Sequence, residues 1–193
     1  MDNVSLSPYQ WAGLLMLAGS VTLGLALVLT SVHPVIQATL TPAVAALLLA
    51  SAALLLLTLP AMYAMQARAA GPLGLLGYVL VELGLLLLVL ISGTPLLHPE
   101  QNGPIAEHPV VFALGIALTL GLLLTAIATY RADVLPRPAA VVMLAAMAGF
   151  FFVFFVAEFL PPAAGQVGTA VFGLSLALGL AWIGLAMWRW PST

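Results

Sequence analysis

Long apolar runs separated by short polar breaks dominate this chain. Six of the runs are long enough to cross a bilayer, because about 20 helical residues span its roughly 30 Å hydrocarbon core. In lipid a segment must satisfy its own backbone polar groups, so we expect each run to be a helix. Proline stands at the start of four runs, where its missing N–H costs nothing. The six runs cover approximately residues 9–29, 42–63, 72–91, 109–130, 138–160 and 167–188.

The composition supports the same interpretation. The chain has 193 residues, of which 64% are hydrophobic and 5% are charged, whereas a typical soluble domain has about 25% charged residues. We therefore predict an all-α membrane protein of the cell's inner (plasma) membrane, with residues 1–193 forming a single domain of six transmembrane helices in a compact bundle. The first apolar run lacks a preceding basic region, so we expect it to be a retained span.

The few basic residues predict the orientation. Arg68 lies between the second and third runs, Arg131 and Arg137 lie between the fourth and fifth, and Arg189 follows the sixth. With six spans, all four fall on one side of the membrane, together with both chain ends. Because basic residues are enriched in cytoplasmic loops, we expect both termini to be cytoplasmic.

The residue inventory argues against several functions. The chain has no cysteine, which excludes disulfides and thiol chemistry. With four basic residues in all, it has no surface for binding nucleic acid. The apolar runs contain no Ser/His pair or pair of aspartates, and no glycine-rich phosphate loop is present. We therefore predict that the protein is not an enzyme.

Two stretches resemble a known family. The first is Leu76-Gly77-Tyr78-Val79-Leu80-Val81-Glu82, and the second is Tyr130-Arg131-Ala132-Asp133-Val134-Leu135-Pro136-Arg137. In this order they resemble an uncharacterised domain-of-unknown-function family of bacterial multi-span integral membrane proteins. The resemblance implies a multi-span fold and no particular activity. The family has an arginine three residues before the glutamate; this chain does not, so Glu82 would lack that partner.

Glu82 is the most informative residue of the sequence. It lies ten residues after Pro72, about 15 Å along a helix, and thus near the middle of the predicted third span. A charge at that depth costs at least about 2.5 kcal/mol, so we expect the carboxyl to be protonated. Its expected partners are a backbone carbonyl or the hydroxyls of Ser20, Ser51 and Thr119. Such a group either joins helices structurally or forms a proton relay, a cation site or an anchor for a polar ligand.

A second candidate site lies on the opposite side from the arginines. His33, His98 and His108 fall there, together with Glu100 and Glu107. These side chains could bind external zinc or copper, although their spacing matches no compact metal motif and they equally suit hydrated helix ends. Histidines at span ends are poorly placed for haem. No other cofactor is predicted.

Two functions agree with these patterns. The first is a non-catalytic accessory or structural subunit of a larger membrane assembly, with the lipid bilayer and other membrane subunits as its partners. The alternative is a small-molecule or proton/ion binding and transport module, with its site around Glu82.

Overall fold

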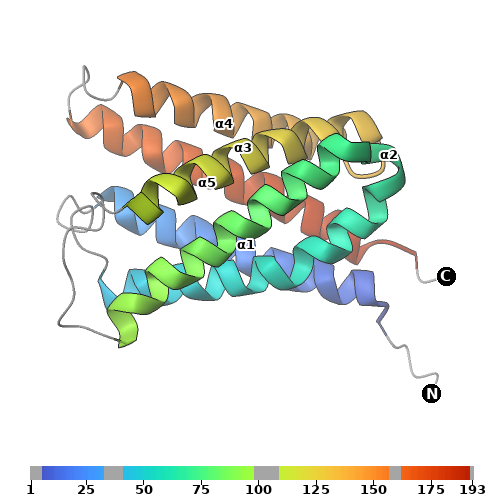
Figure 1. Ribbon diagram of the computed structural model, residues 1–193, viewed down its shortest axis with the longest axis horizontal. Helices are drawn as coiled ribbons and strands as arrows, with labels where there is room; N and C mark the ends of the chain where they lie inside the picture. The colour runs from blue at the N-terminus through green and yellow to red at the C-terminus, as the bar shows by residue number, and fades with distance from the viewer. Residues whose placement is uncertain (1–5, 33–40, 98–108, 157–161, 192–193) are drawn as a thin grey trace.

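The structure is a computed structural model, and it describes residues 6–32, 41–97, 109–156 and 162–191 (Figure 1). All regular structure within these ranges is α-helical, which agrees with the predicted all-α fold. Five helices replace the predicted six, because the second and third apolar runs both belong to α2. The helices are α1 (Pro8–Val32), α2 (Pro42–Leu97), α3 (Pro109–Ala132), α4 (Arg137–Val156) and α5 (Pro162–Trp188).

Short polar signals begin the first two helices. The Ser7 amide donates to Gln10 Oε1 at 2.8 Å, and the Gln10 amide donates to Ser7 Oγ at 3.3 Å. This reciprocal pair is a capping box, which satisfies two amides at the start of α1. Thr41 Oγ1 accepts from the amide of Val44 at 3.5 Å and caps α2. Four of the five helices begin at proline, as expected for the first helical position.

A break at Gly71 divides α2 into two rods. Gly71 has φ 59° and ψ −158°, a backbone conformation that is open essentially to glycine alone. The chain reverses there, so residues 42–70 and 72–97 lie as a hairpin (Figure 1). A straight helix of 56 residues would be about 84 Å long, whereas each half is roughly 40 Å long. A single residue, Gly71, makes the turn. The number of helices is therefore smaller than predicted, because no loop separates the second and third apolar runs.

Glycines allow two pairs of helices to pack closely. Between the second half of α2 and α3, a β-carbon added at Gly121 would lie 2.6 Å from the Val81 nitrogen, and one added at Gly77 would lie 2.7 Å from the Thr125 nitrogen. Between α1 and α5, one added at Gly184 would lie 2.9 Å from the Gly13 carbonyl oxygen. Small residues let backbones approach in this way at helix interfaces. We call these contacts the α2–α3 seam and the α1–α5 seam.

The helices follow one another around a ring. Extensive contacts join α1 to α2, α2 to α3, α3 to α4, α4 to α5, and α5 back to α1. The first half of α2 is the part that meets α1, since a β-carbon added at Gly19 would lie 3.1 Å from the Leu54 β-carbon. The second half of α2 meets α3. Within the described residues, the five helices, with α2 folded back on itself at Gly71, therefore surround a common centre.

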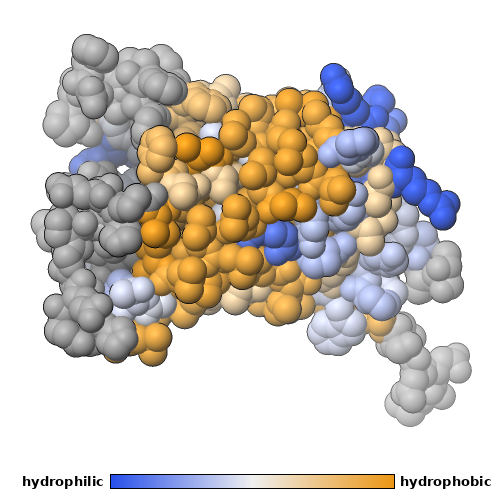
Figure 2. Space-filling view, in the orientation of Figure 1, coloured by the Kyte–Doolittle hydropathy of each residue, from blue (hydrophilic) through white to orange (hydrophobic). Residues whose placement is uncertain are grey.

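On the face that Figure 2 shows, the outer surface is largely apolar along the bundle and hydrophilic at one end. Within the described residues, four helices are long and apolar enough to cross a membrane, and α4 contributes a shorter apolar helix. The start of α1, the bend of α2 and the end of α5 lie at one end of the bundle (Figure 1). We call this the arginine end, because Arg68, Arg131, Arg137 and Arg189 are exposed near these helix ends and the α3–α4 turn.

Candidate functional site

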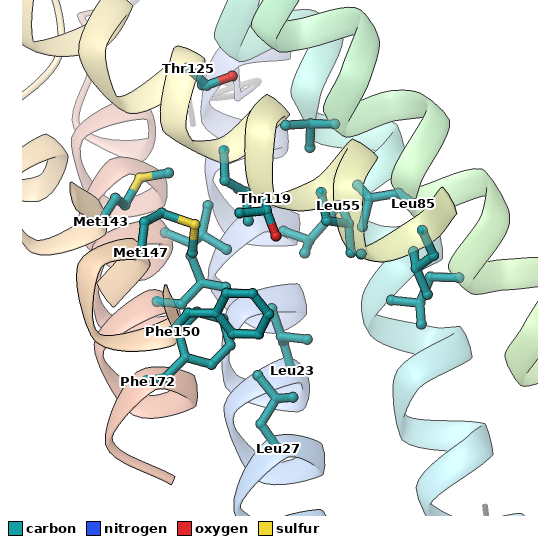
Figure 3. A pocket seen from close by; sticks show the side chains of 18 of the residues that line it. Leu23, Leu27, Leu55, Leu85, Thr119, Thr125, Met143, Met147, Phe150 and Phe172 are labelled. Carbon is teal, nitrogen blue, oxygen red and sulfur yellow. The ribbon is translucent and has the colours of Figure 1, made fainter. Parts of the chain in front are cut away.

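An apolar cavity occupies the centre of the ring. Its volume is about 310 Å³, and every helix contributes to its wall. The side chains point inward from opposite sides of the bundle (Figure 3). Threonine hydroxyls are the polar side-chain groups of this wall, and the remaining side chains are hydrocarbon or thioether. Representative wall residues are Leu23 of α1, Leu55 and Leu85 of the two halves of α2, Thr119 of α3, Met147 of α4 and Phe172 of α5.

The cavity is elongated along the bundle. Its wall extends from Leu48 to Met62 on the first half of α2, which corresponds to about 21 Å of helix. Phe150 and Phe172 line it towards the end remote from the arginines, with ring centroids 4.9 Å apart. Thr125 lies at the opposite end of the cavity (Figure 3). The long axis therefore connects an aromatic end with an end that has a hydroxyl.

Buried polar atoms without partners occur along the bundle, and Ser92 Oγ near the end of α2 remote from the arginines is one of them. Thr125 is 3% exposed, and its buried Oγ1 has no hydrogen-bond partner. Thr129, one turn further along α3, and Gln66, one turn beyond the wall residue Met62, are also buried, and Thr129 Oγ1 and Gln66 Oε1 have no partner either. Buried polar atoms are normally satisfied, so each unsatisfied one requires an explanation.

Glu82 lies beside the cavity and does not line it. Its neighbour Val81 belongs to the wall, whereas Glu82 is half-buried and is not a wall residue. Within the second half of α2, Glu82 is the only charged residue of the sequence. Glu82 Oε1 is buried and has no hydrogen-bond partner.

Tyr78 is the polar neighbour of this carboxyl. It lies four residues before Glu82, one turn earlier on the same helix, so the two side chains share one face of α2. The Tyr78 ring also stacks on Tyr63 across the α2 hairpin, with centroids 4.9 Å apart and an interplanar angle of 17°. The two tyrosines thus fix the surroundings of Glu82 within α2 itself.

The hydroxyls predicted to join Glu82 have other places in the structure. Ser20 Oγ donates to the Leu17 carbonyl, and Ser51 Oγ donates to the Leu48 carbonyl, both at 2.9 Å. Both serines therefore bond to their own helices, which is common for hydroxyls in apolar surroundings. Thr119 lines the cavity. The four candidates do not form one polar network: Glu82 instead has Tyr78 as its neighbour.

The predicted metal ligands lie outside the described residues. These ligands are His33, His98, Glu100, Glu107 and His108. In the ranges that the structure describes, no group of three or more His, Cys, Asp or Glu residues could hold a metal ion. The external zinc or copper site stays a prediction.

Sequence reasoning missed Tyr78, Gln66, Thr125 and Thr129. The spacing of Tyr78 and Glu82 was a readable signal, since residues four apart meet on one helix face. The same spacing relates Thr125 to Thr129. Gln66 is an amide near the end of an apolar run, where it resembles a residue facing the membrane boundary. No sequence pattern showed that it is buried.

Comparison with known proteins gives no match, whether to a protein-family model, a curated protein or a solved structure.

Proposed function

We propose that this protein is a six-span integral membrane protein with both termini in the cytoplasm. The two halves of α2 each have the length of a span, and the face seen in Figure 2 carries an apolar belt. The arginines lie near one end of the bundle. Because basic residues are enriched on the cytoplasmic side of membrane proteins, this end is the cytoplasmic one in our proposal. A cysteine-free chain permits a direct test with Arg131→Cys and Asn102→Cys. On intact cells, an impermeant thiol reagent should label position 102 and leave position 131 unlabelled; the reverse pattern would contradict the orientation.

We further propose that the protein binds one long apolar chain of a membrane lipid inside the ring. The central cavity is the observation that carries this proposal, because its wall is hydrocarbon over most of its length. A water molecule is poorly stabilised in such a cavity, because it needs hydrogen bonds to two to four polar partners. The surrounding bilayer supplies alkyl and isoprenoid chains at high concentration. An elongated apolar cavity within a bilayer is therefore suited to a chain-like ligand.

In this proposal the protein acts as a non-catalytic binding module. It develops the predicted binding alternative but moves the site from Glu82 to the centre of the bundle. The accessory-subunit role stays a prediction, and it is compatible with a protein that holds a lipid within an assembly. Transport would require the ring to open, and the glycine seams hold two of its helix pairs in close contact.

Gly115 offers a way to fill the cavity without disturbing the seams. It lines the cavity, and a β-carbon added there would meet no atom within 4 Å. Gly93 is a matched control: it also has open space around an added β-carbon, but it does not line the cavity. Leucine at either position replaces a helical glycine, so both variants gain similar helix propensity.

The test uses an alkyl diazirine that labels bound sites on illumination. In detergent, the parent protein should show labelling of cavity-wall peptides that excess unlabelled dodecane abolishes. We expect Gly115→Leu to lose this saturable labelling and Gly93→Leu to retain it. The proposal fails if the parent shows only non-saturable labelling, or if both variants behave alike.

A further inference from the structure

We propose that the lipid chain enters the cavity sideways from the bilayer, between α3 and α4, in the half of the bundle remote from the arginine end. This inference rests on the proposed function and assigns the source of the ligand and its route: a lipid of the surrounding membrane, whose chain passes into the ring without leaving the apolar layer. We call this route the lateral opening. It lies between residues 112–119 of α3 and residues 147–151 of α4.

The contact between α3 and α4 is the weakest in the ring. Within the described residues, these two helices are the neighbouring pair in least contact, and α4 has far more contact with α5 than with α3. On the α5 side, a β-carbon added at Gly179 would lie 2.6 Å from Met143 Cγ, and the rings of Phe150 and Phe172 have centroids 4.9 Å apart. Helix α4 also belongs to neither glycine seam. The ring is therefore most easily parted between α3 and α4.

The two helices are held together at the arginine end. Residues 133–136 connect them, Arg137 Nε lies 2.9 Å from Asp133 Oδ1, and the Arg137 guanidinium carbon lies 5.8 Å from the centroid of the Tyr130 ring. From this short turn α3 and α4 diverge, so that the start of α3 and the end of α4 lie apart at the other end of the bundle (Figure 1). Any opening between them therefore lies in the half remote from the arginines.

One face of α3 shows the separation. Ala126, Thr119 and Phe112 follow one another at intervals of seven residues, so they share a face of the helix. Ala126 is 0% exposed, Thr119 is half-buried, and Phe112 is 69% exposed. This face points away from α2, because Gly121, which lies against Val81, is about 200° around the helix from Thr119. The face is thus covered near the α3–α4 turn and uncovered at the start of α3.

Helix α4 shows the same change. Ala140 and Phe151 are three turns apart on one face, and their exposed fractions are 0% and 37%. Met147, one turn before Phe151, is a wall residue and is buried, and the wall residue Phe150 adjoins Phe151. The part of α4 that becomes exposed is therefore the part that borders the cavity at the end remote from the arginines.

The cavity wall has accessible surface at the same end. The wall residues Leu59 and Met62, in the arginine half, are buried, whereas Val111, Leu114 and Gly115 of α3 are half-buried although they belong to the same wall. A β-carbon added at Gly115 would meet no atom within 4 Å, and the cavity is not enclosed on every side. The cavity is therefore narrow towards the arginines and open towards the start of α3.

The rim of the lateral opening selects an apolar ligand. Phe112 and Phe151 lie at its two edges, and Ile116 of α3 is also 45% exposed. A water-soluble or charged ligand would lose its hydration at such a rim without gaining a polar partner, which is costly. A hydrocarbon chain has no such cost, because it passes from one apolar environment to another. The opening therefore suits a chain that comes from the bilayer.

The experiment closes the lateral opening with a reversible bridge, since the chain has no cysteine of its own. Phe112→Cys and Phe151→Cys are combined and joined by a bis-methanethiosulfonate linker. In detergent, the bound alkyl diazirine is released into excess dodecane, and illumination at successive times measures how much remains. We expect the bridge to slow release by about 10-fold or more, and to leave the saturable labelling reached at long times unchanged. A reducing agent should restore the parent rate in the same sample.

Leu123→Cys combined with Leu144→Cys is the matched control. These positions lie on the same faces of the same helices as Phe112 and Phe151, eleven and seven residues nearer the α3–α4 turn, and both leucines pack against the buried core. Because the helices converge there, a shorter linker should join this pair. Because the helices are already in contact there, the bridge should leave the release rate unchanged.

Three results would overturn the inference: an unchanged release rate with the bridge between positions 112 and 151, equal slowing by both bridges, or bridging of both pairs by the same shortest linker. In each of these cases, saturable labelling of the parent would show that the proposed cavity site itself stands. A parent without saturable labelling would instead refute the proposed binding function, and the lateral opening with it.

Discussion

Helix α3 borders both the α2–α3 seam and the central cavity. The two regions differ in how tightly atoms are packed against α3. On α3, a β-carbon at Gly121 would lie 2.6 Å from the backbone of α2, whereas one at Gly115 would meet no atom within 4 Å. The two glycines are six residues apart in similar Leu-rich sequence. Glycine therefore has two different uses here. At the seam it brings backbones together, and at the cavity it leaves space.

These two uses of glycine explain how an apolar protein can keep a cavity at its centre. Tight seams on opposite sides of the ring fix the positions of α1, α2, α3 and α5. The free energy of packing is thus concentrated at the seams, where atoms are in contact, and the cavity wall contributes less.

The largest expected effect is that of Gly121→Leu. The added side chain would collide with the Val81 backbone and Leu80, and backbone atoms cannot move away without separating the helices. Overpacking of this kind costs about 3 kcal/mol or more. We expect loss of a monodisperse species on size-exclusion chromatography in detergent. A fully folded Gly121→Leu variant would show that the seam is loose.

Gly71→Ala tests the turn between the two halves of α2, which precedes the half that forms the α2–α3 seam. An added β-carbon at Gly71 meets no atom within 4 Å, so its cost arises from the backbone at φ 59°. Such a conformation costs a non-glycine residue about 1–3 kcal/mol. Thermal unfolding followed by circular dichroism should show a corresponding destabilisation. Gly93→Ala is the helical control and should be neutral or stabilising; equal midpoints for the two variants would contradict this account of the bend.

Gly115→Leu should act in the opposite direction from Gly121→Leu. It removes a helical glycine, which gains up to about 1 kcal/mol, and it also adds apolar contacts in the cavity. Gly93→Leu gains the first contribution without the second. The unfolding midpoint should therefore rise in both variants, and rise more for Gly115→Leu. Destabilisation by Gly115→Leu would mean that the cavity is already filled by the protein.

Glu82→Gln should have the smallest effect of the series. The residue lies outside both the cavity wall and the seams, and glutamine keeps a donor and an acceptor beside Tyr78. We expect a change below about 1 kcal/mol in unfolding free energy and no change in alkane binding. Abolished alkane binding by Glu82→Gln would return the functional site to Glu82.

Part of this architecture could be predicted from the sequence. The apolar runs gave the helical segments, because run length, proline starts and arginine positions are local signals. The turn at Gly71 was predicted as a boundary but not as a single residue within α2. The cavity could not be predicted, because leucine and alanine occur on every face of these helices. No periodic pattern of polar and apolar residues therefore distinguishes the face that points inward. For the same reason, the sequence could not predict that Glu82 lies outside the cavity wall.

The most direct measurement is a crystal structure of the protein grown in a lipidic mesophase with dodecanol. The account predicts elongated density in the cavity, along the wall between Thr125 at the arginine end and Phe150 and Phe172 at the other. A cavity closed by collapsed side chains, or dodecanol bound only on the outer surface, would contradict it.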